Sequence, residues 1–175
     1  MINKTRMINK KEGAEKMAID VKVPWGEKYT INHVVFDLNG TLANNGEIAK
    51  TTEKLLKALA QKAKIYVLTA DTHNTAGKLK EEIGDFCEII VLQSSDHSEE
   101  KARFVHTLGY RETVTLGNGG NDVKMVQEGI LSFGIIAGEG AYAPLLTKVD
   151  IVVHNIDHAI EMLIHPRKIV ATIRK

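Results

Sequence analysis

An acidic residue directly follows an apolar run near the start of the chain. Residues 34–36 are Val-Val-Phe, Asp37 comes next, and Gly40 and Thr41 follow after two further residues. A buried strand that ends in this way brings one carboxylate to the edge of a sheet, and Gly40 allows a sharp turn because it has no Cβ. Asp37 is therefore a candidate nucleophile or metal ligand, and Thr41 can hydrogen-bond locally or to an anion. Taken alone, the stretch also fits an ordinary strand-to-turn junction, where Asp is common.

Three later stretches supply further groups of the same chemistry. Thr69 ends the apolar run 65–69, and Lys101 stands in the first turn of an expected helix, where the helix dipole disfavours a cation and so indicates an anionic partner. Residues 116–122, Leu-Gly-Asn-Gly-Gly-Asn-Asp, end in a second carboxylate, Asp122. Two carboxylates, a hydroxyl and a lysine match the needs of phosphoryl transfer. Hard oxygen ligands suit Mg²⁺, while the hydroxyl, the lysine and backbone amides can hold a phosphate.

The glycine-rich stretch does not indicate a nucleotide site. The glycines of residues 116–122 do not spell GxGxxG, and the chain has no GxxxxGK[ST] loop. The substrate's own phosphate bond is therefore the expected source of energy.

The elements that must position these residues alternate between strands and helices, and most of the strands are continuous apolar runs. This pattern predicts one α/β domain with a mainly parallel sheet covered on both faces, where ligands bind at the carboxyl ends of the strands. We expect a hairpin whose second strand carries Asp37, a helix capped by Thr51 or Thr52, and another capped by Ser98. The expected strands are 17–23, 28–37, 65–69, 88–92, 113–116, 132–137 and 150–153. The expected helices are 51–63, 74–83, 98–108, 121–128, 141–148, 156–164 and one after Pro166.

Composition narrows the class of protein. The 175 residues are 43% hydrophobic and 26% charged, which fits a single globular domain. We place this domain at residues 17–175 and expect residues 1–16 to form a poorly ordered extension. The net charge of +1 speaks against nucleic acid as a partner, and no apolar stretch approaches the ~18 residues of a membrane helix. The extension lacks the apolar core of a secretory signal. The single cysteine, Cys87, excludes an internal disulfide framework, fits a reducing cytoplasm, and is expected to be a buried thiol.

In this order, the four stretches resemble the four motifs of the haloacid dehalogenase-type (HAD) phosphohydrolases. Residues 34–42 are similar to the nucleophile motif, residues 68–76 to the segment LTGDxxxTA, Lys101 to the lysine of the third motif, and residues 117–122 to GDGxND. The resemblance is greatest to the phosphorylation domain of P-type ATPases and to the soluble P-type-ATPase-like phosphatases. It covers about residues 30–165.

The resemblance implies a Rossmann-like three-layer α/β/α sandwich and a Mg²⁺-dependent phosphatase that forms an aspartyl-phosphate on Asp37. The catalytic residues that it implies are Asp37, Asn39, Thr69 and Lys101. The phosphate-binding residues that it implies are Thr41, Thr69, Ala70, Lys101 and Asn121. The Mg²⁺ ligands that it implies are Asp37, the backbone carbonyl of Asn39, Asn118 and Asp122.

Two positions depart from the pattern of the family. Phosphatases of this group carry an acid–base Asp where this chain has Asn39, which cannot exchange a proton at neutral pH. We therefore expect slow turnover, because acid–base help is worth about 10²–10⁴-fold. Asn118 replaces a metal-binding Asp, so we expect weaker Mg²⁺ binding with more of the ion carried by Asp122. Both substitutions keep open a non-catalytic or regulatory protein that binds a phospho-ligand or a partner.

The spacing of the motifs leaves no room for a cap domain. One helix fits between Asp37 and Thr69, and one helix with one strand fits between Thr69 and Lys101. The site is therefore expected to be open, unless a homo-oligomer partner closes it, and to accept a small-molecule or protein phosphate as substrate.

Overall fold

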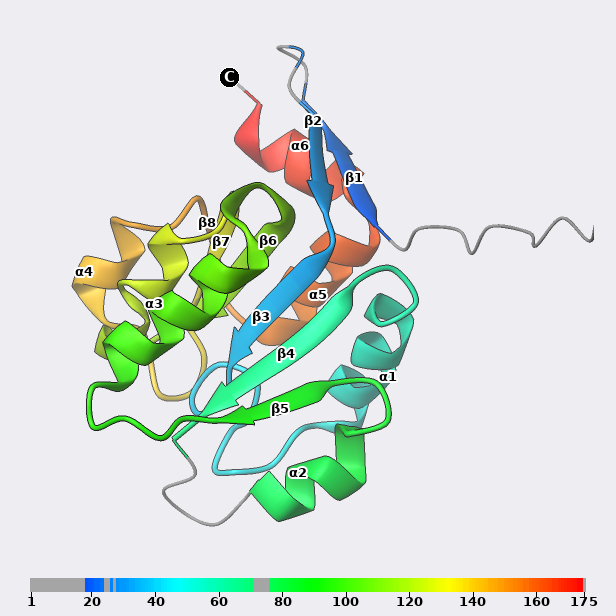
Figure 1. Cartoon of the computed structure of the whole chain (residues 1–175). Coiled ribbons are helices and arrows are strands. Elements are labelled where there is room, and N and C mark those ends of the chain that lie inside the picture. The colour runs from blue at the N-terminus through cyan, green and yellow to red at the C-terminus, as the bar shows by residue number, and fades with distance from the viewer. Residues whose placement is uncertain (1–17, 24–25, 27, 71–75, 175) are drawn as a thin grey trace, which may run out of the picture.

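A six-stranded sheet forms the centre of the protein (Figure 1). The computed structural model describes residues 18–23, 26, 28–70 and 76–174. The sheet order is β5-β4-β3-β6-β7-β8, and every neighbouring pair is parallel, which confirms the expected α/β class. The strands are β3 (His33–Asp37), β4 (Lys64–Thr69), β5 (Glu88–Val91), β6 (Thr113–Gly117), β7 (Leu131–Ile135) and β8 (Ile151–Val153).

The direction in which strands are added reverses at β3. The chain first adds β4 and β5 on one side of β3, and then adds β6, β7 and β8 on the other side. Open α/β sheets bind their ligands where the strand order reverses, at the carboxyl ends of the strands. The fold therefore marks the ends of β3, β4 and β6 as the place for a site.

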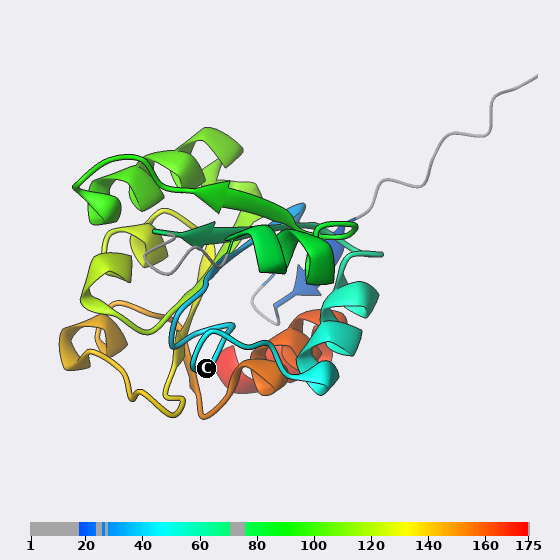
Figure 2. The same ribbon diagram turned by 90° about the horizontal axis from the view of Figure 1, so that it is seen from below.

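Helices cover both faces of the sheet, as expected for a three-layer sandwich. Side chains alternate between the faces, so Val34 and Phe36 of β3 belong to one apolar core and Val35 belongs to the other. The first face is covered by α1 (Lys50–Leu59), α2 (Ala76–Ile83) and α5 (Ile156–Ile164), and the second by α3 (His97–Leu108) and α4 (Ala143–Leu146) (Figure 2).

The N-terminal hairpin is a sheet of its own, and our prediction that its second strand carries Asp37 is wrong. β1 (Ile19–Lys22) pairs antiparallel with β2 (Lys28–Ile31) and contacts α6 (Arg167–Ile173). Asn32 interrupts the expected strand 28–37, because its backbone N–H donates to the carbonyl of Glu112 at 2.9 Å and its side chain donates to the Glu112 carboxylate. The chain then enters the main sheet as β3.

Two helices begin at other residues than we expected. Asp96, not Ser98, caps α3, and its carboxylate accepts a hydrogen bond from the Glu99 backbone N–H at 3.0 Å. Lys101 therefore lies two residues further into the helix than predicted. The residue before α1 is Ala49, which gives no side-chain cap. The hydroxyl of Thr52 donates instead to Asp157 at 2.5 Å, which links α1 to α5.

The expected helix 121–128 is replaced by two short 3-10 turns, at Gly120–Asp122 and Met125–Gln127. Glycine is a poor helix former, and the Asp122 carboxylate accepts backbone N–H groups of the preceding loop, so the chain stays in tight turns. α1 also ends at Leu59, four residues before the predicted end at Ala63, whereas helix 156–164 has the predicted bounds.

The connections of the sheet are short, as the motif spacing indicated. Residues 38–63, all of which the structure describes, hold α1 as their only helix. Residues 70 and 76–96, the described part of the next connection before α3, hold only α2 and β5. Asp71 and the first two residues of the expected helix 74–83 lie outside the described residues. None of the helices in the described part of the chain is long and apolar enough to span a membrane.

Candidate active site

Three neighbouring strands bring the predicted site residues to one edge of the sheet. Asp37 is the last residue of β3 and Thr69 the last residue of β4, while Asn118 directly follows β6. β3 pairs with both β4 and β6, so these three strand ends are adjacent. Asp37 and Thr69 are both buried, as expected for residues that end apolar strands.

The ammonium group of Lys101 holds the centre of this edge. It donates to Oδ1 of Asp37 at 2.5 Å and to Oδ1 of Asp122 at 2.7 Å. All three groups are buried: Lys101 is 1% exposed, Asp37 is 7% exposed and Asp122 is fully buried. The prediction that Lys101 lies beside an anionic partner is therefore confirmed, although a helix start is not what places it there.

The charges of this cluster do not balance, because two carboxylates share one cation. Burial, reinforced by the charge of Asp122, raises the pKa of Asp37 to about 7, against the opposing effect of Lys101. Burial alone would lower the pKa of Lys101, but the two carboxylates outweigh it and hold that pKa above its ordinary value. The cluster therefore carries surplus negative charge when both carboxylates are ionised, which favours binding of a proton or of a second cation.

Asp122 is fully occupied in holding the loop after β6. Its Oδ1 accepts from Lys101, and its Oδ2 accepts from the backbone N–H groups of Asn118 and Gly119 at 3.0 and 2.9 Å. A carboxylate with both oxygens engaged in this way orients its neighbours. This geometry favours a positioning role for Asp122 over the larger share of a metal ion that we expected for it.

Asn118 is fixed at both ends of its amide. The hydroxyl of Thr41 donates to Oδ1 at 3.1 Å, and Nδ2 donates to the carbonyl of Gly140 at 3.2 Å. Asn118 is buried, with 8% of its surface exposed, and the hydrogen bond that its Oδ1 accepts from Thr41 is buried as well. Thr41 thus bridges the turn after β3 to the loop after β6.

Gly40 allows a third loop to approach this point. Its φ of +77° is in the left-handed region, and a Cβ at residue 40 would lie 2.5 Å from Nδ2 of Asn118 and 2.8 Å from Oε2 of Glu139. Sequence reasoning missed Glu139. The only local signal for it is its place between Gly138 and Gly140, two residues typical of a tight turn.

The remaining predicted residues lie around the cluster and differ in exposure. Asn39 is exposed at the turn after β3, Ala70 is half-buried directly after β4, and Asn121 is exposed on the first 3-10 turn. Asn39 therefore has access to solvent at the mouth of the site, and Asn121 lies on the outside of the loop that Asp122 organises.

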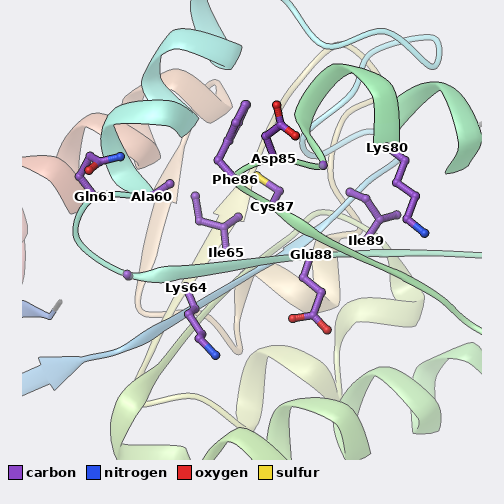
Figure 3. Close-up of a pocket in the computed structure, with 12 residues that line it drawn as sticks. Ala60, Gln61, Lys64, Ile65, Lys80, Asp85, Phe86, Cys87, Glu88 and Ile89 are labelled. Atoms are coloured by element: carbon purple, nitrogen blue, oxygen red, sulfur yellow. The ribbon is translucent and has the colours of Figure 1, made fainter. Parts of the chain in front are cut away.

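The surface has one hollow beside the candidate site and another at the opposite end of the sheet. One of about 270 Å³ is lined by Gly40, Thr41, Glu47, Glu139 and His154, among others, and so borders the site. Another of about 640 Å³ lies by the amino ends of β4 and β5, at the opposite end of the sheet, where Lys80, Glu88 and the buried Cys87 line it (Figure 3).

Solved structures share this architecture at low sequence identity. A 3-deoxy-D-manno-octulosonate 8-phosphate phosphatase from Moraxella catarrhalis, in complex with magnesium ion, phosphate ion and KDO, superposes with a TM-score of 0.64 at 15% identity, over 81% of this chain and 90% of that chain. The cobalt-bound form of the deoxy-D-mannose-octulosonate 8-phosphate phosphatase YrbI from Haemophilus influenzae gives a TM-score of 0.64 at 12% identity, over 83% of this chain and 94% of that chain. A haloacid dehalogenase-like hydrolase from Streptococcus pneumoniae gives 0.58 at 16% identity, over 75% and 97%.

Sequence comparisons find two similar proteins from the archaeon Methanocaldococcus jannaschii. No family model matches the chain. The uncharacterized protein MJ0072 of Methanocaldococcus jannaschii is 44% identical over 39 residues, which cover 22% of this chain and 89% of that protein. The uncharacterized protein MJ0073 of the same organism is 31% identical over 64 residues, which cover 37% of this chain and 69% of that protein. The chain therefore belongs to the same family as these two archaeal proteins, and it has the fold of the HAD hydrolases.

Proposed function

We propose that this chain is a Mg²⁺-dependent phosphatase that hydrolyses phosphate monoesters through an aspartyl-phosphate on Asp37. The observation that carries the proposal is the buried pair of carboxylates that share Lys101 at the point where the strand order reverses. The HAD fold supports the reaction class, since solved neighbours with this fold are named as phosphatases. The finer resemblance to P-type-ATPase-like phosphatases stays a prediction.

The donor set at this edge fits Mg²⁺. The unbalanced negative charge of the cluster calls for a cation, and the available donors are hard oxygens, as Mg²⁺ prefers. We assign the ion to the Asp37 carboxylate, the backbone carbonyl of Asn39 and Oδ1 of Asn118. When bound, the ion would neutralise charge on the phosphoryl group. No cluster of three or more acidic, histidine or cysteine side chains suited to a metal occurs among the residues that the structure describes, in keeping with amide and carbonyl donors at two of these positions.

The chain's own residues account for two displacement steps. In the first, a carboxylate oxygen of Asp37 forms a bond to phosphorus while the bond from phosphorus to the leaving oxygen breaks. In the second, water attacks phosphorus, the bond to Asp37 breaks, and inorganic phosphate and the free carboxylate result. Lys101 offsets negative charge on Asp37 and on the phosphoryl oxygens, and the Thr69 hydroxyl can donate to those oxygens.

Proton transfer is the weak part of this mechanism. The leaving oxygen takes its proton from solvent, because the amide of Asn39 has none to give at neutral pH. Water is likewise not activated by residue 39 in the second step. We therefore propose slow turnover, fastest for leaving groups that need no proton, with a long-lived phospho-enzyme.

The neighbours support a small phosphate ester as substrate. The Moraxella catarrhalis structure holds a phosphate ion and KDO, so a small phosphorylated metabolite is the class that we propose here. The short connections around the site leave it open, which also suits a bulkier phosphorylated group.

A phospho-ligand-binding protein without turnover is the second candidate. Asn39 and Asn118 favour it, because both replace carboxylates that the catalytic cycle of HAD phosphatases uses. Asp37, Thr69 and Lys101 favour the enzyme, because a binding protein has no need of a nucleophile with this environment.

The test is hydrolysis of p-nitrophenyl phosphate with and without Mg²⁺. We expect slow, Mg²⁺-dependent release that Asp37→Asn abolishes and that Asn39→Asp accelerates by about 10²-fold. Asn45→Asp adds the same charge at an exposed position of the same loop, outside the hollow that borders the site, and it should leave the rate unchanged. Absence of any release from the wild type, with Mg²⁺ binding intact, would favour the binding protein.

A further inference from the structure

We propose that Glu139 supplies, at the Mg²⁺ site, the negative charge that Asn118 does not carry. The proposal rests on the function proposed above and adds a residue to its metal site. Glu139 lies in the loop between β7 and α4, far in sequence from the nucleophile and from the loop after β6.

The loop that carries Glu139 is fixed to Asn118. The turn closes through a hydrogen bond from the Gly140 N–H to the carbonyl of Ala137 at 2.9 Å. The amide of Asn118 donates to the carbonyl of Gly140 at 3.2 Å, and the carbonyl of Asn118 accepts from the N–H of Tyr142 at 2.8 Å. The residues that follow Glu139, Gly140 and Tyr142, are thus held to Asn118, and the turn closes across Glu139 itself.

The carboxylate of Glu139 points toward the site rather than away from it. Its Oε2 and the Asn118 Nδ2 both lie within 2.8 Å of the point where a Cβ of residue 40 would be, so the two side chains are neighbours. Only glycine leaves this space open. Gly40 directly follows Asn39, whose carbonyl we assign to the ion, and precedes Thr41, which donates to Asn118.

The ligand set that we assign to Mg²⁺ contains a single carboxylate. Both oxygens of Asp122 accept hydrogen bonds from Lys101 and from backbone amides, so Asp37 is the one carboxylate in the assigned ligand set. A divalent ion held by one carboxylate and neutral oxygens binds weakly, because charge count sets much of the affinity for hard cations.

Glu139 could add negative charge near the Mg²⁺ site without being a direct ligand of the ion. It makes no hydrogen bond or ion pair within the described ranges 18–23, 26, 28–70 and 76–174, and it is exposed. From this position its carboxylate would add negative charge beside a bound Mg²⁺, an ion that usually keeps several of its waters. Partners in this outer position typically change metal affinity by about 10–100-fold.

The experiment is titration of the full chain with Mg²⁺ by calorimetry. Glu139→Gln should weaken Mg²⁺ binding by about tenfold. Asn118→Asp should tighten binding and make it nearly independent of residue 139, so the double variant Asn118→Asp/Glu139→Gln should bind at least as tightly as the wild type. Glu47→Gln is the matched control, because Glu47 lines the same hollow, is exposed, and lies near Lys78 instead.

The outcomes separate this proposal from the function on which it rests. Unchanged affinity in Glu139→Gln, with binding that Asp37→Asn still abolishes, overturns the role of Glu139 and leaves the phosphatase standing. Equal weakening by Glu47→Gln also overturns it, because it would show an effect of overall charge alone. Absence of Mg²⁺ binding by the wild type would overturn the metal site itself. Melting temperatures in EDTA identify any variant whose fold has changed.

Discussion

The ammonium of Lys101 lies 2.5 Å from the carboxylate of Asp37, although 64 positions separate the two residues in the chain. The contact joins α3 to the end of β3, and Asp122 completes it from the other side. We therefore expect this contact to affect both the chemistry of the site and the stability of the fold.

Replacing Lys101 by methionine tests that balance. Lys101→Met would leave two buried carboxylates without their cation, and breaking a buried ion pair from one side costs about 3–5 kcal/mol. We expect a loss of that order in the free energy of unfolding, measured by urea denaturation at neutral pH, together with loss of phosphatase activity. Lys124→Met, which removes an exposed ion pair with Glu99, should change stability little. A stable but inactive Lys101→Met would contradict the structural half of the prediction.

The raised pKa of Asp37 predicts how stability depends on pH without metal. In the unfolded chain Asp37 loses its proton near its ordinary pKa of 3.8, whereas in the folded protein it does so at a pKa of about 7. Between these values the folded state binds more protons, so its stability should fall as the pH rises from about 4 to about 7. Melting temperatures in EDTA should show this slope in the wild type and a smaller slope in Asp37→Asn. Parallel curves for the two proteins would refute the assignment.

Saturating Mg²⁺ should offset this loss if the ion binds the ionised form of Asp37, as we propose. The same melting series repeated with Mg²⁺ should therefore show its largest gain at the highest pH. Asp37→Asn should show little gain at any pH.

Comparing Gly40 with Gly46 tests whether the close packing of Asn118 and Glu139 against Gly40 matters. Gly40 and Gly46 both have a φ of +77°, but a Cβ at residue 46 would meet nothing within 4 Å. Gly46→Ala should cost only the strain of a left-handed alanine, about 1 kcal/mol. Gly40→Ala should cost more, and it should weaken Mg²⁺ binding because Asn118 and Glu139 must move. Similar effects of the two substitutions on Mg²⁺ affinity would exclude a special role for Gly40.

Cys87 should be chemically inert in the folded protein. It is buried, and burial raises its pKa to about 12, so the reactive thiolate is scarce at neutral pH. Reaction with a chromogenic disulfide reagent should be slow in buffer and fast in denaturant. Rapid stoichiometric reaction of the native protein would show that the amino end of β5 opens readily.

The sequence was informative wherever chemistry followed directly on an apolar run. Asp37 and Thr69 end strands that are continuous hydrophobic stretches, so their position at the sheet edge follows from local pattern and from the geometry of parallel sheets. The prediction of Lys101 near an anion was correct, but the helix begins at His97, and its register rather than its first turn brings Lys101 to the carboxylates.

The features that sequence reasoning missed depend on contacts between distant segments. Asn32 leaves the expected strand because Glu112 satisfies its backbone and side chain, and nothing local marks this partner. The expected helix after Asn118 gives way to 3-10 turns because Asp122 turns back to accept the N–H groups of the loop. Glu139 lies in an unremarkable turn, and only the folded chain brings it to Gly40.

The surplus negative charge around Lys101 also links the supply of cation to the lifetime of the protein. A buried carboxylate without a counter-charge of its own lowers the free energy of unfolding, but it also leaves a site that can bind a cation. Any cation that enters this site returns part of that stability, by an amount that grows with its concentration. If the site binds Mg²⁺ as proposed, proteases that remove the unfolded fraction in a cell would degrade the metal-free chain sooner than the metal-bound one. The abundance of the protein would then follow the availability of that cation without a separate regulator.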